Sequence, residues 1–448
     1  MAGIRGGSDH LIVIGAGPVG LAAALLTAAH GPVTLYEAAD EIVLSEENSY
    51  PIGVNLRGQE ALRRIDPALL ARLTEQGEMI AAWNIYAGRR RVAHLISGNV
   101  IGTTRAFLTR ILLDAATADP RITLVTGHRL IGLNTTSRQL TFRRPGGEEA
   151  TVDASGARVL AADGVWSAAR RSLVDQVPGF TPTVDDWGVQ FRVLFSPPDA
   201  SAAGLDPAEH HIFTDKGIYT ATLDGGVWGV SLTAVRGAAD EELLTSTDAS
   251  DTHVAALQRH LQTYAPKVVP LLDADAYRAF FGRAAFSGAV VRCPFVHVGE
   301  WLVLLGDAAH SVIPPTGEGV NSGLEDCCVL ADHLDSGSAT PLTDYNAARL
   351  PDLAALGEYA WQLMENTRTT DPARRATTII LRILATIASR LGGPPTVEER
   401  LFGAHAGRDP YREVFADWIA QRERLHSPIH RVARLFVRGR EARVTPSE

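Results

Sequence analysis

The chain has 448 residues, 46% of them hydrophobic, and a formal net charge of −9. This length is enough for two or three domains with cores of their own, and the negative charge argues against a protein that binds nucleic acid through a basic surface. The three cysteines, Cys293, Cys327 and Cys328, show no metal-binding spacing and form no even set for disulfides, so we expect no metal site and a cytoplasmic location.

The N-terminal segment has the pattern of a nucleotide-binding unit. An apolar run at residues 10–14 precedes the turn Gly15-Ala16-Gly17-Pro18-Val19-Gly20, then an Ala- and Leu-rich helix and a second apolar run that ends at Glu37. In such a unit the first glycine makes the tight turn, the second admits a pyrophosphate and the third lets helix and strand pack closely. The acid after the second strand can accept hydrogen bonds from a ribose. FAD and NAD(P) share this turn, so it leaves the identity of the dinucleotide open.

Two further segments follow in the first half of the chain. Residues 102–113 predict a helix that Arg105 opens. Residues 159–162 predict a strand that enters the sequence Asp163-Gly164-Val165-Trp166-Ser167-Ala168-Ala169-Arg170. As local structure, this sequence is a turn followed by a helix with Ser167 as its N-cap.

From residue 187 to residue 235 apolar and polar residues alternate, which predicts an antiparallel sheet with one packed and one polar face. Its polar residues include Gln190, Arg192, His211 and Tyr219. The family resemblance given below implies that this sheet forms the floor of a substrate pocket, which makes these four residues candidates for that pocket. For each of them, a position on the surface of the sheet is an equally good interpretation.

The most distinctive stretch is residues 306–321, with the sequence GDAAHSVIPPTGEGVN. It follows an apolar run and precedes an apolar-periodic helix, so it predicts a strand, a long loop and a helix start. Asp307 leaves the end of the strand, two prolines stiffen the loop, and Gly317 and Gly319 let the backbone approach a ligand closely. The backbone N–H groups at the helix start favour negative charge there. We expect His310 to orient this loop through a hydrogen bond rather than to act as a base.

The last hundred residues predict mainly helices and carry no motif. Their longest apolar segment, residues 376–391, is interrupted by Arg382 and Arg390 and is shorter than the ~20 residues that cross a bilayer. We therefore expect no transmembrane segment, and a packed amphipathic helix in its place. The sequence leaves open whether the protein is a monomer or a homodimer.

Together, three motifs in this order resemble the flavoprotein aromatic hydroxylases, the family built like p-hydroxybenzoate hydroxylase. They are GxGxxG at residues 15–20, DGxxSxxR at 163–170 and GDAAHxxxPxxGxGxN at 306–321. The resemblance implies an α/β fold: an FAD-binding Rossmann-like domain of the glutathione reductase type, a substrate domain with an antiparallel sheet, and a helical C-terminal region. The FAD-binding domain would comprise residues 1–75, 97–182 and 290–345, the substrate domain residues 76–96 and 183–289, and the C-terminal region residues 346–448.

The spacing and the resemblance together assign site residues. Those expected to bind the cofactor are Gly15, Gly17, Pro18, Val19, Gly20, Glu37, Arg105, Asp163, Asp307, Gly317, Gly319, Val320 and Asn321. Those expected to frame the isoalloxazine ring and the oxygen-transfer pocket, and so to serve catalysis, are Pro314, Pro315, Thr316 and Gly317.

The implied activity is a monooxygenase that uses FAD, NADPH or NADH, and molecular oxygen. It would hydroxylate an electron-rich aromatic small molecule through a C4a-hydroperoxyflavin. An oxidase or dehydrogenase of the same fold, without oxygen insertion, is an alternative, and a non-catalytic FAD-binding protein is another. No second GxGxxG motif marks a separate nicotinamide domain, which agrees with a family in which NAD(P)H contacts the FAD domain only transiently.

Within that family the likeness is to the kynurenine 3-monooxygenases, through residues 306–334, 55–62 and 349–352. Those enzymes use an Arg just before a Met-Ile pair to hold the carboxylate of the substrate, whereas this chain has Glu78 before Met79-Ile80. A carboxylate that faced Glu78 would be repelled. The substrate could therefore be kynurenine itself or an anthranilate- or quinolone-like compound of a specialised pathway.

Overall fold

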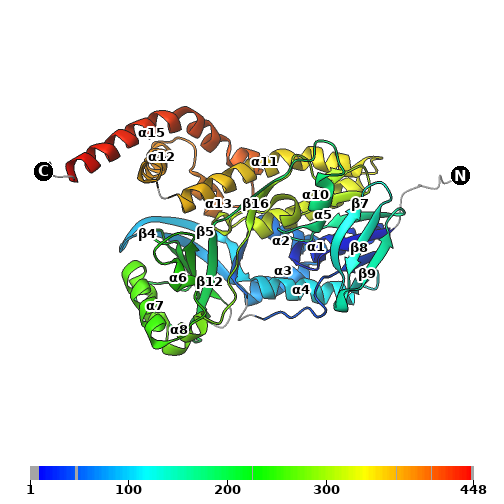
Figure 1. Ribbon diagram of the computed structural model, residues 1–448, viewed down its shortest axis with the longest axis horizontal. Coiled ribbons are helices and arrows are strands. Elements are labelled where there is room, and N and C mark those ends of the chain that lie inside the picture. The colour runs from blue at the N-terminus through cyan, green and yellow to red at the C-terminus, as the bar shows by residue number, and fades with distance from the viewer. Residues whose placement is uncertain (1–9, 46–48, 224–225, 370, 405, 445–448) are drawn as a thin grey trace.

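The computed structural model describes residues 10–45, 49–223, 226–369, 371–404 and 406–444 (Figure 1). A six-stranded sheet forms the centre of one half of the molecule. Its order is β17 (His297–Val298), β18 (Leu302–Leu304), β10 (Ala157–Ala161), β1 (His10–Ile14), β2 (Val33–Tyr36) and β6 (Ile122–Val125). All neighbours are parallel except β17 and β18. The central strands are almost continuously apolar and buried, because helices cover both faces of a parallel sheet.

Helices and a small sheet surround these strands. The helices are α1 (Pro18–Thr27), α2 (Leu56–Ile65), α3 (Pro67–Gln76), α4 (Arg105–Ala118), α5 (Ala168–Val174), α9 (Asp307–His310) and α10 (Gly319–Asp335). The small sheet consists of β7 (Arg129–Asn134), β8 (Gln139–Arg143) and β9 (Glu149–Asp153). Helix α1 packs against α10 and α4, so the segment after the first glycine turn contacts the segment after the long loop.

The second half of the molecule contains a seven-stranded sheet. Its order is β12 (Val189–Phe195), β15 (Val227–Val235), β14 (Ile218–Leu223), β13 (Glu209–Phe213), β4 (Glu78–Ala87), β5 (Arg90–Thr104) and β3 (Pro51–Val54). Only β13 and β4 are parallel neighbours. One face packs on the helices α6 (Glu241–Thr245), α7 (Asp251–Tyr264) and α8 (Ala274–Phe280), at the lower left of Figure 1. A two-stranded ribbon, β11 (Thr183–Asp186) with β16 (Ala289–Arg292), joins the two halves.

The C-terminal region is helical, as the sequence predicts. It consists of α11 (Pro341–Arg368), α12 (Pro372–Arg390), α13 (Val397–Phe402), α14 (Tyr411–Val414) and α15 (Ala416–Val444). Helix α13 contacts β5, whereas α12 and α15 pair with each other at the upper left of Figure 1. None of the helices in the described ranges has the length and apolar character needed to cross a membrane.

The expectation that the apolar segment 376–391 packs into the protein is wrong for most of its Ile and Leu side chains. Five large apolar side chains of α12 are between 36% and 57% exposed, and Leu391, which follows the helix, is 82% exposed. The amphipathic pattern is present, but α15 covers only part of the apolar face, because Ala373 and Thr377 are the buried residues of α12.

Candidate functional site

The glycine turn after β1 has a geometry that only glycine permits at two positions. Gly15 has φ +97°, and a Cβ atom there would lie 2.4 Å from the carbonyl oxygen of Ala162. A Cβ on Gly20 would lie 1.8 Å from the carbonyl oxygen of Gly15. The turn therefore packs directly against the end of β10, and its backbone N–H groups at the start of α1 stay available to a phosphate.

Glu37, at the end of β2, holds this turn in place. Its carboxylate accepts hydrogen bonds from the backbone N–H of Ala16 (2.7 Å) and of Ala39 (2.9 Å). The role as a ribose ligand stays a prediction, but the side chain is already fixed where the two parallel strands end.

Arg105 and Asp307 meet at the glycine turn although they come from distant parts of the sequence. Arg105 opens α4, and its Nη2 atom is 3.9 Å from the position of a Cβ atom on Gly17. Asp307 opens α9 and has an exposed side chain. The surrounding protein hinders hydration of the carboxylate and raises the pKa of Asp307, while the positive charges of His310, Arg105 and Arg170 oppose this shift.

The turn at Asp163 is tied to the same loop. One carboxylate oxygen of Asp163 accepts hydrogen bonds from the N–H groups of Ala168 and Ala169, and within the described ranges the other oxygen has no partner. Arg170 is 2% exposed and donates to the carbonyl oxygen of Ala308 (2.8 Å). Its guanidinium thus joins the second motif to the third.

The long loop offers an exposed edge. Pro314, Pro315 and Gly317 are exposed, and Gly317 has the left-handed φ of +69°. Thr316 is fully buried and bonded within the loop, donating to the carbonyl oxygen of Ile313. At its end, Gly319 and Val320 open α10 with intermediate exposure.

Asn321 links the long loop to the seven-stranded sheet through hydrogen bonds. It is 1% exposed, its side-chain oxygen accepts from the N–H of Asn55, and its amide donates to the carbonyl oxygens of Gly53 (2.8 Å) and Gly317 (2.9 Å). The bonds to the end of β3 and the start of α2 fix the distance between the long loop and the seven-stranded sheet.

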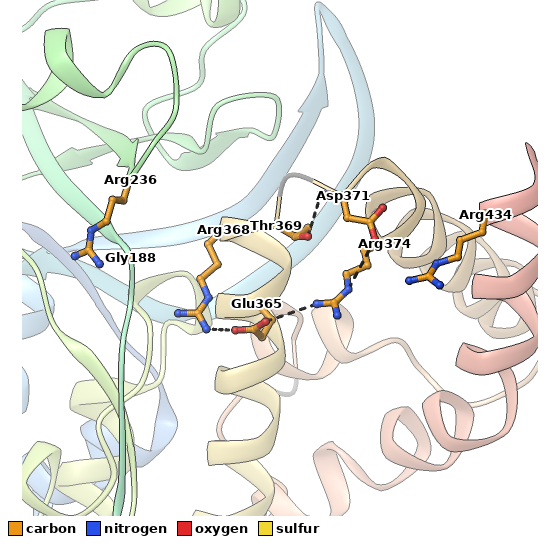
Figure 2. A pocket seen from close by; sticks show the side chains of 8 residues that line it. All are labelled: Gly188, Arg236, Glu365, Arg368, Thr369, Asp371, Arg374 and Arg434. Atoms are coloured by element: carbon orange, nitrogen blue, oxygen red, sulfur yellow. Dashed lines mark hydrogen bonds and ion pairs between the residues drawn. The ribbon is translucent and has the colours of Figure 1, made fainter. Parts of the chain in front are cut away.

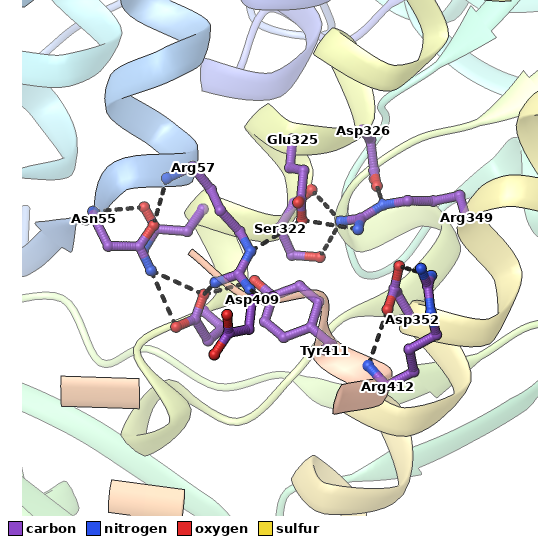
Figure 3. Close-up of polar contacts among 12 residues, drawn as sticks. Asn55, Arg57, Ser322, Glu325, Asp326, Arg349, Asp352, Asp409, Tyr411 and Arg412 are labelled. Carbon is purple, nitrogen blue, oxygen red and sulfur yellow. Dashed lines mark hydrogen bonds and ion pairs between the residues drawn. The ribbon is translucent and has the colours of Figure 1, made fainter. Parts of the chain in front are cut away.

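Beneath the loop lies a buried network of charged side chains (Figure 3) that the sequence analysis missed. His310 contacts Asp326 at 2.5 Å, so the hydrogen bond expected of this histidine is present and ties the loop to α10. Arg349 donates to Asp326 (2.7 Å) and pairs with Glu325 (2.8 Å), and Asp326 also accepts from the N–H of Gly306.

A second part of this network joins the loop to the C-terminal region. Glu318 is 1% exposed and accepts hydrogen bonds from the hydroxyl of Tyr411 (2.6 Å) and from Asn55. Arg57 lies 4.0 Å from the centre of the Tyr411 ring (Figure 3). Burial raises the pKa of Glu318, and Arg57, Tyr411 and Asn55 oppose that shift. Only the position of Glu318 between two motif glycines could have indicated its role.

The candidates for the substrate pocket lie on different faces of the seven-stranded sheet. Arg192 is buried on the helix-covered face and donates to the carbonyl oxygens of Ser246 and Thr245. His211 lies on the same face, between Tyr86 and Trp228. Tyr219 lies on the opposite face. We leave Arg192 and His211 out of the proposed site because both lie on the face that α6–α8 cover: Arg192 packs over Phe280 of α8, and His211 packs against Tyr86 and Trp228.

Glu78 and Gln190 are exposed, at the start of β4 and on the edge strand β12. The residue that accompanies Tyr219 is His210, whose Nδ1 atom contacts the Tyr219 hydroxyl. Adjacent residues of a strand point to opposite faces, so the choice between His210 and His211 needed the position of the helices.

One cavity lies away from these motifs. It has a volume of about 590 Å³ and opens between the seven-stranded sheet and the C-terminal helices (Figure 2). Its lining includes Arg236, Arg368 and Arg374. Arg236 pairs with Asp186, Arg368 pairs with Glu365, and Arg374 pairs with both Glu365 and Asp371. None of the motif residues lines it, so we do not place the chemistry there.

Among the residues that the structure describes, no group of three or more His, Cys, Asp or Glu side chains could hold a metal ion.

Comparison with known proteins gives a consistent result. The model of a family described as FAD binding domain matches residues 9–356. The chain is 27% identical to kynurenine 3-monooxygenase from Sus scrofa over 361 residues, which is 78% of this chain and 74% of that protein. It superposes on p-nitrophenol 4-monooxygenase PnpA from Pseudomonas putida DLL-E4 with a TM-score of 0.64 at 19% identity, covering 92% of this chain and 97% of that one. Klebsiella pneumoniae HpxO complexed with FAD and uric acid also gives 0.64, at 20% identity, with 88% and 95% covered.

Proposed function

The chain belongs to the FAD binding domain family, and from that premise we propose that it is a monooxygenase that hydroxylates an electron-rich aromatic small molecule. The proposal includes NADPH or NADH as reductant and molecular oxygen as co-substrate. The observation that carries it is the meeting of all three motifs at one place. The side chain of Arg105 reaches Gly17, and its positive charge opposes the rise in the pKa of Asp307. Arg170 donates a hydrogen bond to the carbonyl oxygen of Ala308.

The residues at this place fit FAD. Gly15 and Gly20 leave no room for side chains where the turn meets β10, and Gly17 is extended at the start of α1. Arg105 supplies a positive charge for the phosphates, and the exposed Asp307 supplies a carboxylate for hydroxyl groups of the ribityl chain. One carboxylate oxygen of Asp163 has no partner among the residues that the structure describes.

When bound, FAD would accept a hydride from NAD(P)H and, with oxygen, supply the electrophilic oxygen atom that is added to the aromatic ring. The contribution of the chain is to position the ring and to exclude water. The exposed edge at Pro314, Pro315 and Gly317 borders the place for the reacting ring. Ile80 and Val100, both buried on the facing side of the sheet, provide an apolar wall.

We propose a substrate other than kynurenine for this chain, although several of its relatives are named kynurenine 3-monooxygenase. The support is Glu78, an exposed acid at the start of β4, at the position where the resemblance implies an arginine for the substrate carboxylate. An aromatic compound without a free carboxylate avoids the repulsion between two negative charges.

The experiment is to purify the protein, record its flavin spectrum and follow NADPH and NADH oxidation with kynurenine, anthranilate, quinolones and simple phenols, one at a time. Mass spectrometry of the product and a hydrogen peroxide assay accompany each reaction. A compound that stimulates oxidation and gains one oxygen atom supports the proposal. A compound that stimulates NAD(P)H oxidation and yields hydrogen peroxide, but no oxygenated product, would favour an oxidase. Failure to bind FAD would contradict the proposal at its base.

Replacing Arg105 by Gln is expected to weaken FAD binding about tenfold or more. A hydrogen bond to a charged group contributes about 1.5–3 kcal/mol, and about 1.4 kcal/mol corresponds to a factor of ten. The dissociation constant is measured by quenching of FAD fluorescence on addition of apoprotein. Arg121→Gln is the matched control, since Arg121 is an exposed arginine that pairs with Asp119. Equal affinities for the two variants would contradict the assignment of Arg105.

A further inference from the structure

Four aromatic side chains form a compact group on the face of the seven-stranded sheet opposite α6–α8. We call them the aromatic cluster: Trp83, His210, Tyr219 and Phe402. Trp83 and His210 face each other on neighbouring parallel strands with ring centroids 4.7 Å apart, and the centroids of Trp83 and Phe402 are also 4.7 Å apart. The cluster combines residues of β4, β13 and β14 with one from α13.

The aromatic cluster lies beside the long loop. A Cβ atom on Gly317 would lie 3.2 Å from Phe402, and one on Gly102 would lie 3.4 Å from the Nε2 atom of His210. Gly102 pairs with Gly53, whose carbonyl oxygen accepts the hydrogen bond from Asn321. Two independent routes therefore connect the cluster to the loop that borders the proposed reaction site.

Two polar atoms in the aromatic cluster are buried and lack hydrogen-bond partners within the described ranges. They are Nε1 of Trp83, in a side chain that is 6% exposed, and Nε2 of His210, in one that is 3% exposed. Leaving a buried donor unpaired costs about 1–3 kcal/mol. A ligand that supplied an acceptor at this place would remove that cost.

The contact between His210 and Tyr219 determines which atom of the histidine carries the proton. The hydroxyl of Tyr219 and Nδ1 of His210 are each other's partners. If Tyr219 donates to Nδ1, the Tyr219 hydroxyl and the Nδ1 atom each have a partner, and the hydrogen of the neutral ring lies on Nε2. If Nδ1 were the donor, the hydrogen of Tyr219 and the lone pair of Nε2 would both lack partners among the described residues. The first arrangement is therefore favoured, and it makes Nε2 a donor.

Burial lowers the pKa of His210 to about 3, with a smaller contribution from the neighbouring His211. The ring is therefore neutral at physiological pH. The cluster thus presents two neutral donors, Trp83 and His210, and no positive charge among its own four side chains. Neutral donors match the oxygen of a carbonyl group, whereas a buried carboxylate would need a cation beside it.

We infer that the aromatic cluster binds an aromatic substrate through a carbonyl oxygen on its ring system, with Nε1 of Trp83 and Nε2 of His210 as donors. This inference rests on the proposed function. Tyr219 is a positioning residue in it, since it holds the tautomer of His210. Phe402 packs on the ring of Trp83 and brings the C-terminal region into the substrate site.

The test uses two probes that differ only in the acceptor: 2-aminoacetophenone, which has a carbonyl group, and 2-ethylaniline, which has a methylene group in its place. Dissociation constants for the FAD-loaded protein are measured by titration calorimetry. The wild type is expected to bind the ketone at least tenfold more tightly, because a site built for a hydrogen bond rejects an analogue that lacks it.

Two variants identify the residues. Trp83→Phe and Tyr219→Phe are each expected to reduce the ratio of the two constants severalfold, while FAD content stays at the wild-type value. Trp418→Phe is the matched control, because Trp418 lies in α15, outside both the cluster and the three motifs. A merely structural role would weaken both probes equally and leave the ratio unchanged.

Equal binding of the two probes by the wild type, absence of binding for both, or an unchanged ratio in both variants would overturn the inference. Oxygen transfer is measured on the same samples by mass spectrometry. Selective binding of the ketone, with no oxygenated product from any aromatic compound in the panel, would defeat the proposed function and leave the binding inference standing.

Discussion

Replacing Asp326 by Asn is expected to lower the free energy of unfolding by about 3–5 kcal/mol, the cost of removing one member of a buried charged network. Asp326 is fully buried and contacts His310, Arg349 and the N–H of Gly306. The neutral amide leaves the charge of Arg349 only partly compensated, through Glu325. Because Gly306 begins the long loop, we also expect the variant to retain less FAD. Urea unfolding of the apoprotein and the flavin content of the purified protein measure the two effects.

Asp332→Asn is the matched control. It makes the same chemical change on the same helix, α10, but Asp332 is 61% exposed and pairs with Arg64 at the surface. Surface ion pairs contribute about 0–1 kcal/mol. A loss of stability in the Asp326 variant no greater than in the Asp332 variant would show that the buried network does not hold the loop.

The dependence on pH has a definite sign. The positive charges of His310 and Arg349 and their hydrogen bonds outweigh the effect of burial, so the pKa of Asp326 is lowered below its ordinary value. A carboxyl group with a lowered pKa in the folded state stabilises the protein above its unfolded pKa of about 3.9. That stability is lost as the pH falls through the folded-state value. The difference in the free energy of unfolding between the wild type and Asp326→Asn should therefore have its full value at pH 6 and shrink below about pH 4.

The features that the sequence predicted well are those that depend on local backbone requirements. Gly15 and Gly20 are needed because of atoms a few ångströms away in the same turn or at the end of β10, and a short motif carries that information. The same holds for Arg105, which opens its helix as expected. These requirements located the place where the three motifs meet.

The features that the sequence did not predict depend on which elements cover which face. In β13 two histidines are adjacent, and the alternation cannot tell which one faces the long loop. Arg192 lies on the helix-covered face, and its hydrogen bond to Ser246 joins residues that are 54 positions apart. Glu318 and Tyr411 are 93 residues apart. The sequence analysis assigned no role to Glu318, because its partners could not be identified from its neighbours in the sequence.

Replacing Gly20 by Ala is expected to weaken FAD binding by about 10- to 100-fold. Helix propensity alone would predict the opposite, since Ala is favoured over Gly inside a helix by about 1 kcal/mol. At this position, however, a Cβ atom would lie 1.8 Å from the carbonyl oxygen of Gly15 and 3.5 Å from the Cβ atom of Ala162. The backbone oxygen cannot move without shifting the turn.

Overpacking of this kind costs about 1–3 kcal/mol, and about 1.4 kcal/mol corresponds to a tenfold change in affinity. The steric effect therefore outweighs propensity, and its consequence falls on the turn that faces the phosphates. The dissociation constant of FAD is measured by fluorescence quenching, with Gly156→Ala as control, because a Cβ atom on Gly156 meets no atom within 4 Å. If Gly20→Ala bound FAD as tightly as the control variant, helix α1 would have to tolerate displacement from β10. The close packing of turn, helix and strand would then not be what prepares the phosphate site.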